Sequence, residues 1–122
     1  MLETFQKTIL KKVLFKGIGL HNGLKSIIEI LPAGANHGII FKRTDLDHNN
    51  LIEVDFKNVS SAKLCTTLTN NFNVSVSTVE HLLAAIYITG VDNALIEINS
   101  SEVPIMDGSS KEFVETINEA GV

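Results

Sequence analysis

The sequence predicts an α+β fold in two layers, in which a largely antiparallel sheet carries two helices on one face. Two observations support this prediction. The first half of the chain has runs of β-branched and apolar residues separated by turn-forming residues, as strands do. The second half has two segments whose apolar residues recur at helical spacing, with one strand-like segment between them. A sheet covered by two helices on one face is the simplest way to bury the apolar sides of these elements.

The strands expected in the first half end at residues that favour turns. The segments that read as strands are 8–15, 24–31, 38–43, 63–69 and 73–76. Asn22-Gly23 predicts a hairpin between the first two, because both residues tolerate positive φ. Pro32 then breaks the second strand, and Asn70-Asn71 predicts a second hairpin.

Two helices and one strand are expected in the second half. The first helix has apolar residues at helical spacing from Val79 to Tyr87, and Gly90 is positioned to end it in a left-handed conformation. Residues 94–98 alternate as a strand does. The apolar stripe of the second helix is Phe113, Val114, Ile117 and Ala120, and Gly121 ends that helix. Ser77 with Glu80, and Ser109 with Glu112, have the spacing of a capping box at each helix start.

The composition is that of one ordinary globular domain over residues 1–122. Hydrophobic residues make up 44% of the chain, charged residues 20%, and the formal charge is −4. Basic residues occur singly or in pairs, which argues against a duplex nucleic-acid partner. The single cysteine, Cys65, excludes an internal disulfide and a cysteine-based zinc site, so we expect a reducing compartment. No secretory signal or apolar stretch of about 20 residues is present, and we therefore expect a cytoplasmic protein without a membrane span.

Glu80 and His81 carry the most chemical information in the sequence, and the residue pattern leaves two interpretations open. In the structural interpretation, Ser77 caps the helix, Glu80 folds back onto that cap, and His81 is an exposed first-turn residue. In the functional interpretation, the positive end of the helix dipole disfavours a charged imidazole, so His81 can bind a metal. Glu80 can then accept a proton from a water that the metal activates. One turn later the helix has only Ala84 and Ala85, so it offers no second ligand.

The remaining candidates are weaker. His21, His37 and His48 lie in turns or polar loops, where a histidine is usually just solvated. Cys65 is most simply a small buried hydrophobe, because no base lies near it in the sequence. The glycine-rich segment 17–23 leads into a strand rather than a helix, so hairpin geometry explains it better than phosphate binding.

Five motifs resemble those of the UDP-3-O-acyl-N-acetylglucosamine deacetylase family, in the family's order and with similar spacing. They are GIGLHNG at 17–23, RTDL at 43–46, LCT at 64–66, STVEHL at 77–82 and PIMDGS at 104–109. The resemblance covers essentially the whole chain. It implies a zinc-dependent hydrolase that removes the N-acetyl group of a UDP-sugar, releasing acetate, at the committed step of lipid A synthesis in Gram-negative bacteria.

The resemblance also implies roles for individual residues. His81 is expected to be one of three zinc ligands, and Glu80 the general base that acts on the zinc-bound water. Leu64, Cys65 and Thr66 match a segment near the catalytic zinc and are expected to bind substrate.

The family is built from two similar domains with the active site between them, and this chain resembles the first domain only. The other two zinc ligands, a His and an Asp of a His-Lys-x-x-Asp motif, belong to the second domain, and that motif does not occur here. The family's histidine that acts as electrostatic stabiliser or general acid also lies there. His21 matches a histidine close to the active site whose role sequence cannot assign. The second domain, in cis or in trans, and the UDP-sugar substrate are thus the expected partners, and the chain alone is expected to be inactive.

Two alternatives to a deacetylase part remain. One is a non-catalytic module of the same fold that binds a sugar nucleotide or a protein. The presence of Glu80 and His81 argues against it, because such a module needs neither residue. The other is a truncated product without activity, which this pair does not exclude.

Overall fold

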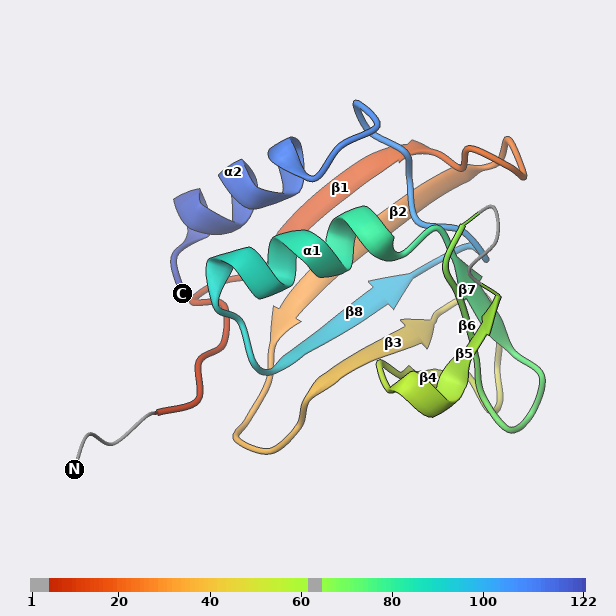
Figure 1. Cartoon of the computed structure of the whole chain (residues 1–122), viewed down its shortest axis with the longest axis horizontal. Helices are drawn as coiled ribbons and strands as arrows, with labels where there is room; N and C mark the ends of the chain where they lie inside the picture. The colour runs from red at the N-terminus through yellow and green to blue at the C-terminus, as the bar shows by residue number, and fades with distance from the viewer. Residues whose placement is uncertain (1–4, 62–64) are drawn as a thin grey trace.

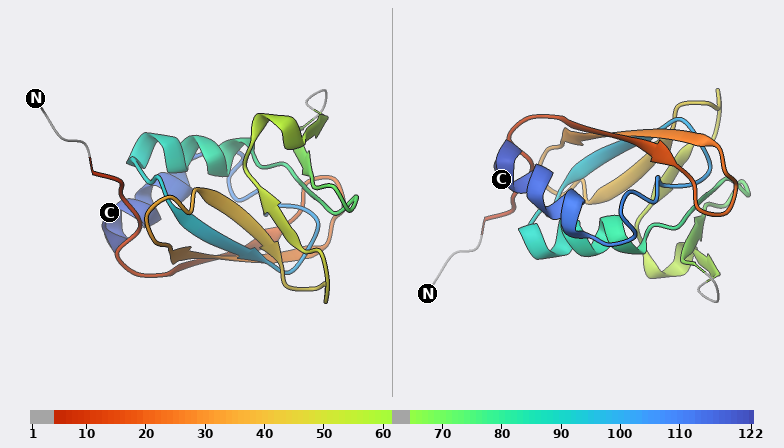
Figure 2. Two further views of the ribbon diagram at one scale, coloured as in Figure 1. Left: turned by 90° about the horizontal axis from the view of Figure 1, so that it is seen from below. Right: turned by 90° about the horizontal axis from the view of Figure 1, so that it is seen from above.

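A five-stranded sheet forms one layer of the molecule, and two helices cover one of its faces, as the sequence predicts (Figures 1 and 2). The structure is a computed structural model and describes residues 5–61 and 65–122. The strand order is β1-β2-β8-β3-β4. The strands are β1 (Val13–Ile18), β2 (Lys25–Pro32), β8 (Ala94–Ile98), β3 (Ile39–Arg43) and β4 (Leu51–Glu53). Neighbours are antiparallel except β3 and β8, which run parallel.

The core lies between this sheet and the helices. Successive side chains of a strand point to opposite faces, and the alternating buried positions of β2 and β8 point to the helices. Ile28 pairs with Ile98 and Ile30 with Ile96, and all four are buried. Phe41 of β3 pairs with Ile96 from the other side and is also fully buried. The sheet therefore supplies a continuous apolar floor for the helices.

Helices α1 (Glu80–Thr89) and α2 (Lys111–Ala120) pack against this floor and against each other. Their buried residues are Leu82, Ala85 and Ile86 in α1 and Phe113, Ile117 and Ala120 in α2. The rings of Phe15 and Phe113 meet edge to face with centroids 4.8 Å apart, which ties α2 to β1. Gly90 ends α1 at φ 81° and ψ 21°, the left-handed conformation that the sequence predicts. No helix in the described residues is long and apolar enough to cross a bilayer.

A second, smaller sheet stands beside the start of α1 (Figure 1). It consists of β5 (Val59–Ser61), β6 (Thr67–Thr69) and β7 (Ser75–Ser77), follows the short 3-10 helix η1 (Phe56–Asn58), and is antiparallel. The sequence predicts the β6–β7 hairpin from the turn residues Asn70-Asn71, although each strand has only three residues. It does not predict β4 and β5, which are equally short and are not joined by such a turn. The first strand begins later than expected, at Val13, and Thr8 forms only an isolated bridge with Asn93.

Neither helix start forms the full capping box expected there, although the Ser109 hydroxyl accepts the N–H of Lys111 at 3.2 Å before α2. The residues that precede the helices, Val79 and Ser110, have no side-chain cap hydrogen bond. Ser77 belongs to β7 and pairs with Thr67, so the chain is still extended there and the helix begins only at Glu80. Glu80 is consequently the first helical residue and not the third. Its carboxylate is free of the structural task that the capping-box interpretation assigns to it.

Candidate functional site

At the start of α1, the chain passes from the small sheet into the helix layer. Glu80 and His81 are its first two residues, and both are half-buried. The unpaired N–H groups at a helix start create a positive potential, which favours a carboxylate such as Glu80. Glu80 and His81 thus both lie in the first turn of the helix.

The side chain of Glu80 is held in place by the backbone N–H of Thr66. The Oε2 atom of Glu80 accepts a hydrogen bond from the Thr66 N–H at 3.0 Å. The Thr66 carbonyl in turn accepts the N–H of Thr78 at 2.9 Å and that of Val79 at 3.4 Å. The backbone N–H and C=O of one residue, Thr66, thus contact both the side chain of Glu80 and the backbone leading into the helix. Within the described part of the chain, no residue bonds the Oε1 atom of Glu80.

The expected substrate-binding segment lies beside this pair. Thr66 contacts Glu80 directly, and Cys65 is the residue before it. Cys65 is half-buried, and its Sγ lies 3.8 Å from the Oγ1 of Thr67. Leu64, the third residue expected there, lies outside the described residues. The structure thus brings Cys65 and Thr66 to the start of α1, although they precede it by about fourteen residues in sequence.

His21 is connected to the start of α1 through one buried carboxylate. It is exposed, in the turn between β1 and β2, and its backbone N–H donates to Glu102 at 2.9 Å. The N–H of Asn22 donates to the same carboxylate at 2.9 Å. On the other side, the hydroxyl of Thr78 donates to Oε2 of Glu102. Ser77 also forms a parallel bridge with Glu102, which brings that residue alongside the entry to α1.

Sequence reasoning missed Glu102. A single acid after two serines has the pattern of an exposed loop residue, yet Glu102 is only 2% exposed. Burial alone raises the pKa of Glu102, but the hydrogen bonds from the Thr78 hydroxyl and the two turn amides outweigh it and lower the pKa. The side chain is therefore ionised at neutral pH. Its partners lie 24 and about 80 residues away in sequence, so no local signal reveals it.

The described residues do not form a complete metal site. They contain no group of three His, Cys, Asp or Glu side chains close enough to share a metal ion. The Nδ1 of His37 lies 2.9 Å from the neighbouring Gly38 carbonyl, and His48 is in an exposed loop. His81 is the one histidine beside a carboxylate at a helix start.

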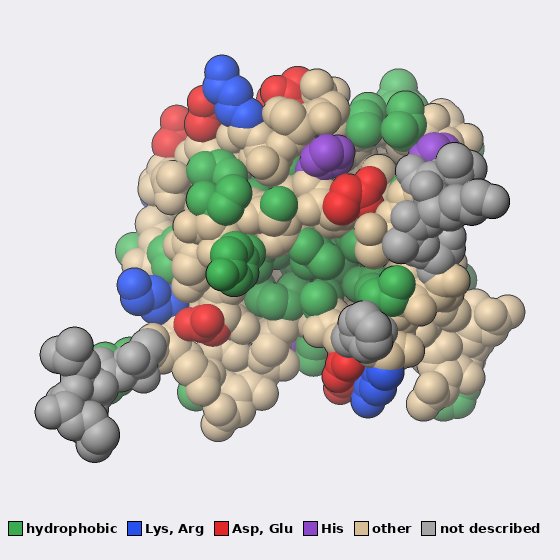
Figure 3. Space-filling model, viewed as in Figure 1, with side chains coloured by type: hydrophobic (Ala, Val, Ile, Leu, Met, Phe, Trp, Pro, Cys, Tyr) green, Lys and Arg blue, Asp and Glu red, His purple; other side chains and the backbone are tan. Residues whose placement is uncertain are grey.

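Hydrophobic side chains gather along α1 and in a hollow beside it (Figure 3). The exposed members on the helix include Tyr87, which is 86% exposed, and Ile88, which is 63% exposed. These two side chains are neighbours in the sequence and leave apolar surface exposed on the helix.

The sequence matches the family model for UDP-3-O-acyl N-acetylglycosamine deacetylase over residues 6–122. The chain belongs to this family. The match includes both sheets, both helices and the whole of the site described above.

Among curated proteins, the chain is similar to several named UDP-3-O-acyl-N-acetylglucosamine deacetylase. It is 49% identical over 117 residues to those of Geotalea uraniireducens and of Idiomarina loihiensis, in each case across 96% of this chain. It is 43% identical over 118 residues to that of Shewanella baltica. The matched part is 38% of the first two relatives and 39% of the third, so the chain spans well under half the length of these deacetylases.

Proposed function

We propose that this chain is the amino-terminal domain of a zinc-dependent deacetylase. The enzyme would hydrolyse the N-acetyl group of UDP-3-O-acyl-N-acetylglucosamine and release acetate, as part of lipid A synthesis in the cytoplasm of Gram-negative bacteria. The observation that carries the proposal is the hydrogen bond from Thr66 to Glu80, next to His81 at the start of α1. It gives this family member an oriented carboxylate beside a histidine.

Glu80 is proposed as the general base. Its Oε2 is engaged by the Thr66 amide at 3.0 Å, which sets the orientation of the carboxylate plane. The other oxygen can accept a proton from the water that attacks the acetyl carbonyl. A positioned carboxylate of this kind contributes roughly 10²–10⁴ in rate as a general base.

His81 is proposed as one of three zinc ligands. Catalytic zinc sites commonly have three protein ligands and one open position. The described residues supply one suitable nitrogen, so the proposal assigns the other two ligands to the second domain. Zinc bound there would supply Lewis-acid activation of the water and the amide carbonyl. Leu64, Cys65 and Thr66 are proposed to contact substrate, and no role is assigned to His21.

The second domain is proposed to cover the apolar side of α1. Tyr87 and Ile88 expose large apolar surfaces on that helix, and the relatives continue well beyond the matched part. Burying such a surface returns about 25 cal/mol per Å² before the entropic cost of association. A covering domain would also bring its ligands to His81, which is about two turns away on the same helix.

Complementation tests the proposal. This chain is mixed with a separately produced second domain of a relative and with zinc, and deacetylation of the UDP-sugar is measured. Activity should appear only in the mixture and should rise with the concentration of either half, because assembly is bimolecular. His81→Ala should abolish activity and lower the zinc content. Glu80→Gln should keep zinc but lower turnover by roughly 10²–10⁴.

His48→Ala is the matched control, since that histidine is exposed in the loop between β3 and β4. It should leave the recovered activity unchanged. Activity in this chain alone, or recovery that does not depend on His81, would refute the proposal. A mixture that binds the UDP-sugar without hydrolysing it would favour the alternative of a binding module.

A further inference from the structure

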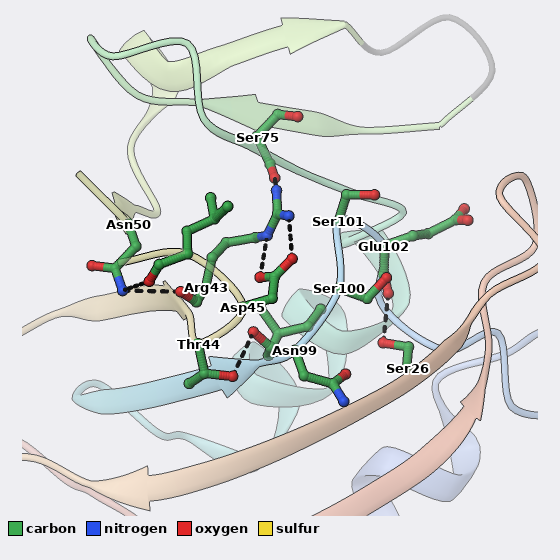
Figure 4. A network of polar contacts seen from close by, with 12 residues as sticks. Ser26, Arg43, Thr44, Asp45, Asn50, Ser75, Asn99, Ser100, Ser101 and Glu102 are labelled. Atoms are coloured by element: carbon green, nitrogen blue, oxygen red, sulfur yellow. Dashed lines mark hydrogen bonds and ion pairs between the residues drawn. The ribbon is translucent and has the colours of Figure 1, made fainter. Parts of the chain in front are cut away.

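Glu102 joins three segments that are far apart in sequence. Its carboxylate accepts the backbone N–H groups of His21 and Asn22 from the β1–β2 turn and the hydroxyl of Thr78 from the entry to α1. Its own carbonyl accepts the Ser26 hydroxyl at 2.6 Å, which fixes its backbone against β2 (Figure 4). A buried carboxylate with this many donors is held firmly on every side.

The β1–β2 turn closes tightly over this carboxylate. A Cβ atom added to Gly19 would lie 2.5 Å from Oε1 of Glu102, closer than real Cβ contacts come. Gly19 also forms a bridge with Pro104, two residues after Glu102. The absence of a side chain at Gly19 is therefore what allows the turn amides to reach the carboxylate.

Thr78 has a backbone conformation that threonine rarely adopts. Its φ is 61°, in the left-handed region that disfavours β-branched residues, and it is buried. Its N–H donates to the Thr66 carbonyl, and its hydroxyl donates to Glu102. Because Thr78 lies two residues before Glu80, its φ sets the direction in which the chain enters α1.

We infer that Glu102 is a positioning residue for the Glu80–His81 site, acting through the hydroxyl of Thr78. By accepting that hydroxyl it holds Thr78 in the left-handed conformation, which keeps the carboxylate of Glu80 against the amide of Thr66. The positioning itself belongs to this chain's structure, and its catalytic consequence rests on the proposed function.

The two sides of Glu102 have separable tasks. The bonds from the turn amides stabilise the hairpin, whereas the bond from the Thr78 hydroxyl is the one that reaches the site. Thr78→Val removes that hydroxyl and keeps the shape of the side chain, whereas Thr78→Ser keeps the hydroxyl. A role in folding alone would lower protection throughout the sheet. A positioning role predicts a local loss at Thr66.

Amide hydrogen exchange on the chain measures this difference. The Thr66 amide bonds to the Glu80 carboxylate, so its protection reports that contact. Thr78→Val should lower the protection of Thr66 by roughly ten- to a hundredfold relative to the amides of β8, the loss expected for a hydrogen bond to a charged group. Thr78→Ser should retain it. His21→Ala is the control. It should have no effect at Thr66, because His21 bonds to Glu102 through its backbone N–H.

Thr78→Ala keeps the inference testable if the valine variant does not fold. Alanine removes the same hydroxyl and is not β-branched, so it is less strained at positive φ than valine, but it still needs a tie to stay there, and Thr66 should lose protection. An unchanged Thr66 amide in the alanine and valine variants, or an equal loss at β8, would overturn the inference. In the complemented enzyme, Thr78→Val should lower kcat with little change in KM. A local loss at Thr66 without any deacetylation in the wild-type mixture would support positioning and refute the proposed function.

Discussion

Replacing Glu102 by glutamine should destabilise the folded chain near neutral pH by about 1–3 kcal/mol. Glutamine keeps the length and shape of the side chain but removes its charge and replaces one acceptor oxygen by a donor. The side chain is 2% exposed, so water cannot take over the lost interactions. The perturbation therefore tests the ionised carboxylate and not the packing around it.

The size of this destabilisation follows from the three donors that hydrogen-bond to the carboxylate. The N–H groups of His21 and Asn22 each lie 2.9 Å from Oε1, and the Thr78 hydroxyl bonds Oε2. A hydrogen bond to a charged group contributes about 1.5–3 kcal/mol and a neutral one about 0.5–1.5. Each bond is thus weakened by about 1 kcal/mol, and the Thr78 hydroxyl must turn away from the new amide. The smaller desolvation cost of a neutral group offsets part of this loss.

The pH dependence shows whether the charge of Glu102 stabilises or destabilises the folded chain. Burial raises the pKa of Glu102 but the hydrogen bonds lower it further, so its folded pKa lies below the usual value of 4.5. A depressed pKa contributes stability that is present above the unfolded value and is lost as the pH falls through the folded value. The wild-type chain should therefore exceed Glu102→Gln in stability at neutral pH. The gap should close below 4.5, because protonated Glu102 resembles glutamine.

Urea unfolding of the wild-type chain and of Glu102→Gln, from neutral pH to well below pH 4.5, measures this difference in stability. The comparison is needed because Asp45 also has a lowered pKa, through its hydrogen bonds with Arg43, and contributes to acid unfolding of both chains. The difference between the two chains isolates Glu102. A glutamine variant as stable as the wild type at neutral pH, or a gap that does not change with acid, would refute the reasoning.

Three further predictions concern the Arg43–Asp45 ion pair, the glycines of the β1–β2 turn and zinc binding. Arg43→Met should cost about 1.5–3 kcal/mol in urea unfolding, because Arg43 forms a bidentate pair with Asp45 at 2.6 and 2.9 Å and donates to a β7 carbonyl at 3.0 Å (Figure 4). Asp45→Asn should cost less than about 1 kcal/mol, since Asp45 is partly exposed and the bond to β7 remains; equal losses would contradict this account. Gly19→Ala should lower the thermal midpoint more than Gly23→Ala, because a side chain at Gly19 strikes Glu102, whereas Gly23 has open space and only the strain of φ 68°; the reverse order would be unexpected. The chain alone should bind no zinc stoichiometrically at submicromolar free metal in equilibrium dialysis, because His81 is a single ligand, and tight binding would reveal ligands that this account lacks.

Local patterns in the sequence determined most of the secondary structure. Alternating apolar residues indicated β2, β3 and β8, and helical spacing indicated α1 and α2, because these periods reflect one buried face per element. Gly23 and Gly90 adopt the positive φ expected of them. The pair at the start of α1 was also visible, since a carboxylate next to a histidine is a local feature. Its proposed role in a zinc hydrolase rests on motifs shared with a known family.

The surroundings of Glu80 and His81 depend on the tertiary structure. The Ser77 capping box failed because pairing of β7 with β6 keeps the chain extended at Ser77, and strand pairing depends on residues that are not local. The parallel pairing of β3 with β8 joins segments about 55 residues apart. Glu102 reaches the β1–β2 turn across about 80 residues and Thr78 across 24. A sequence pattern reports which face of an element is buried, whereas the partner that satisfies a buried polar group is fixed only when distant segments pack together.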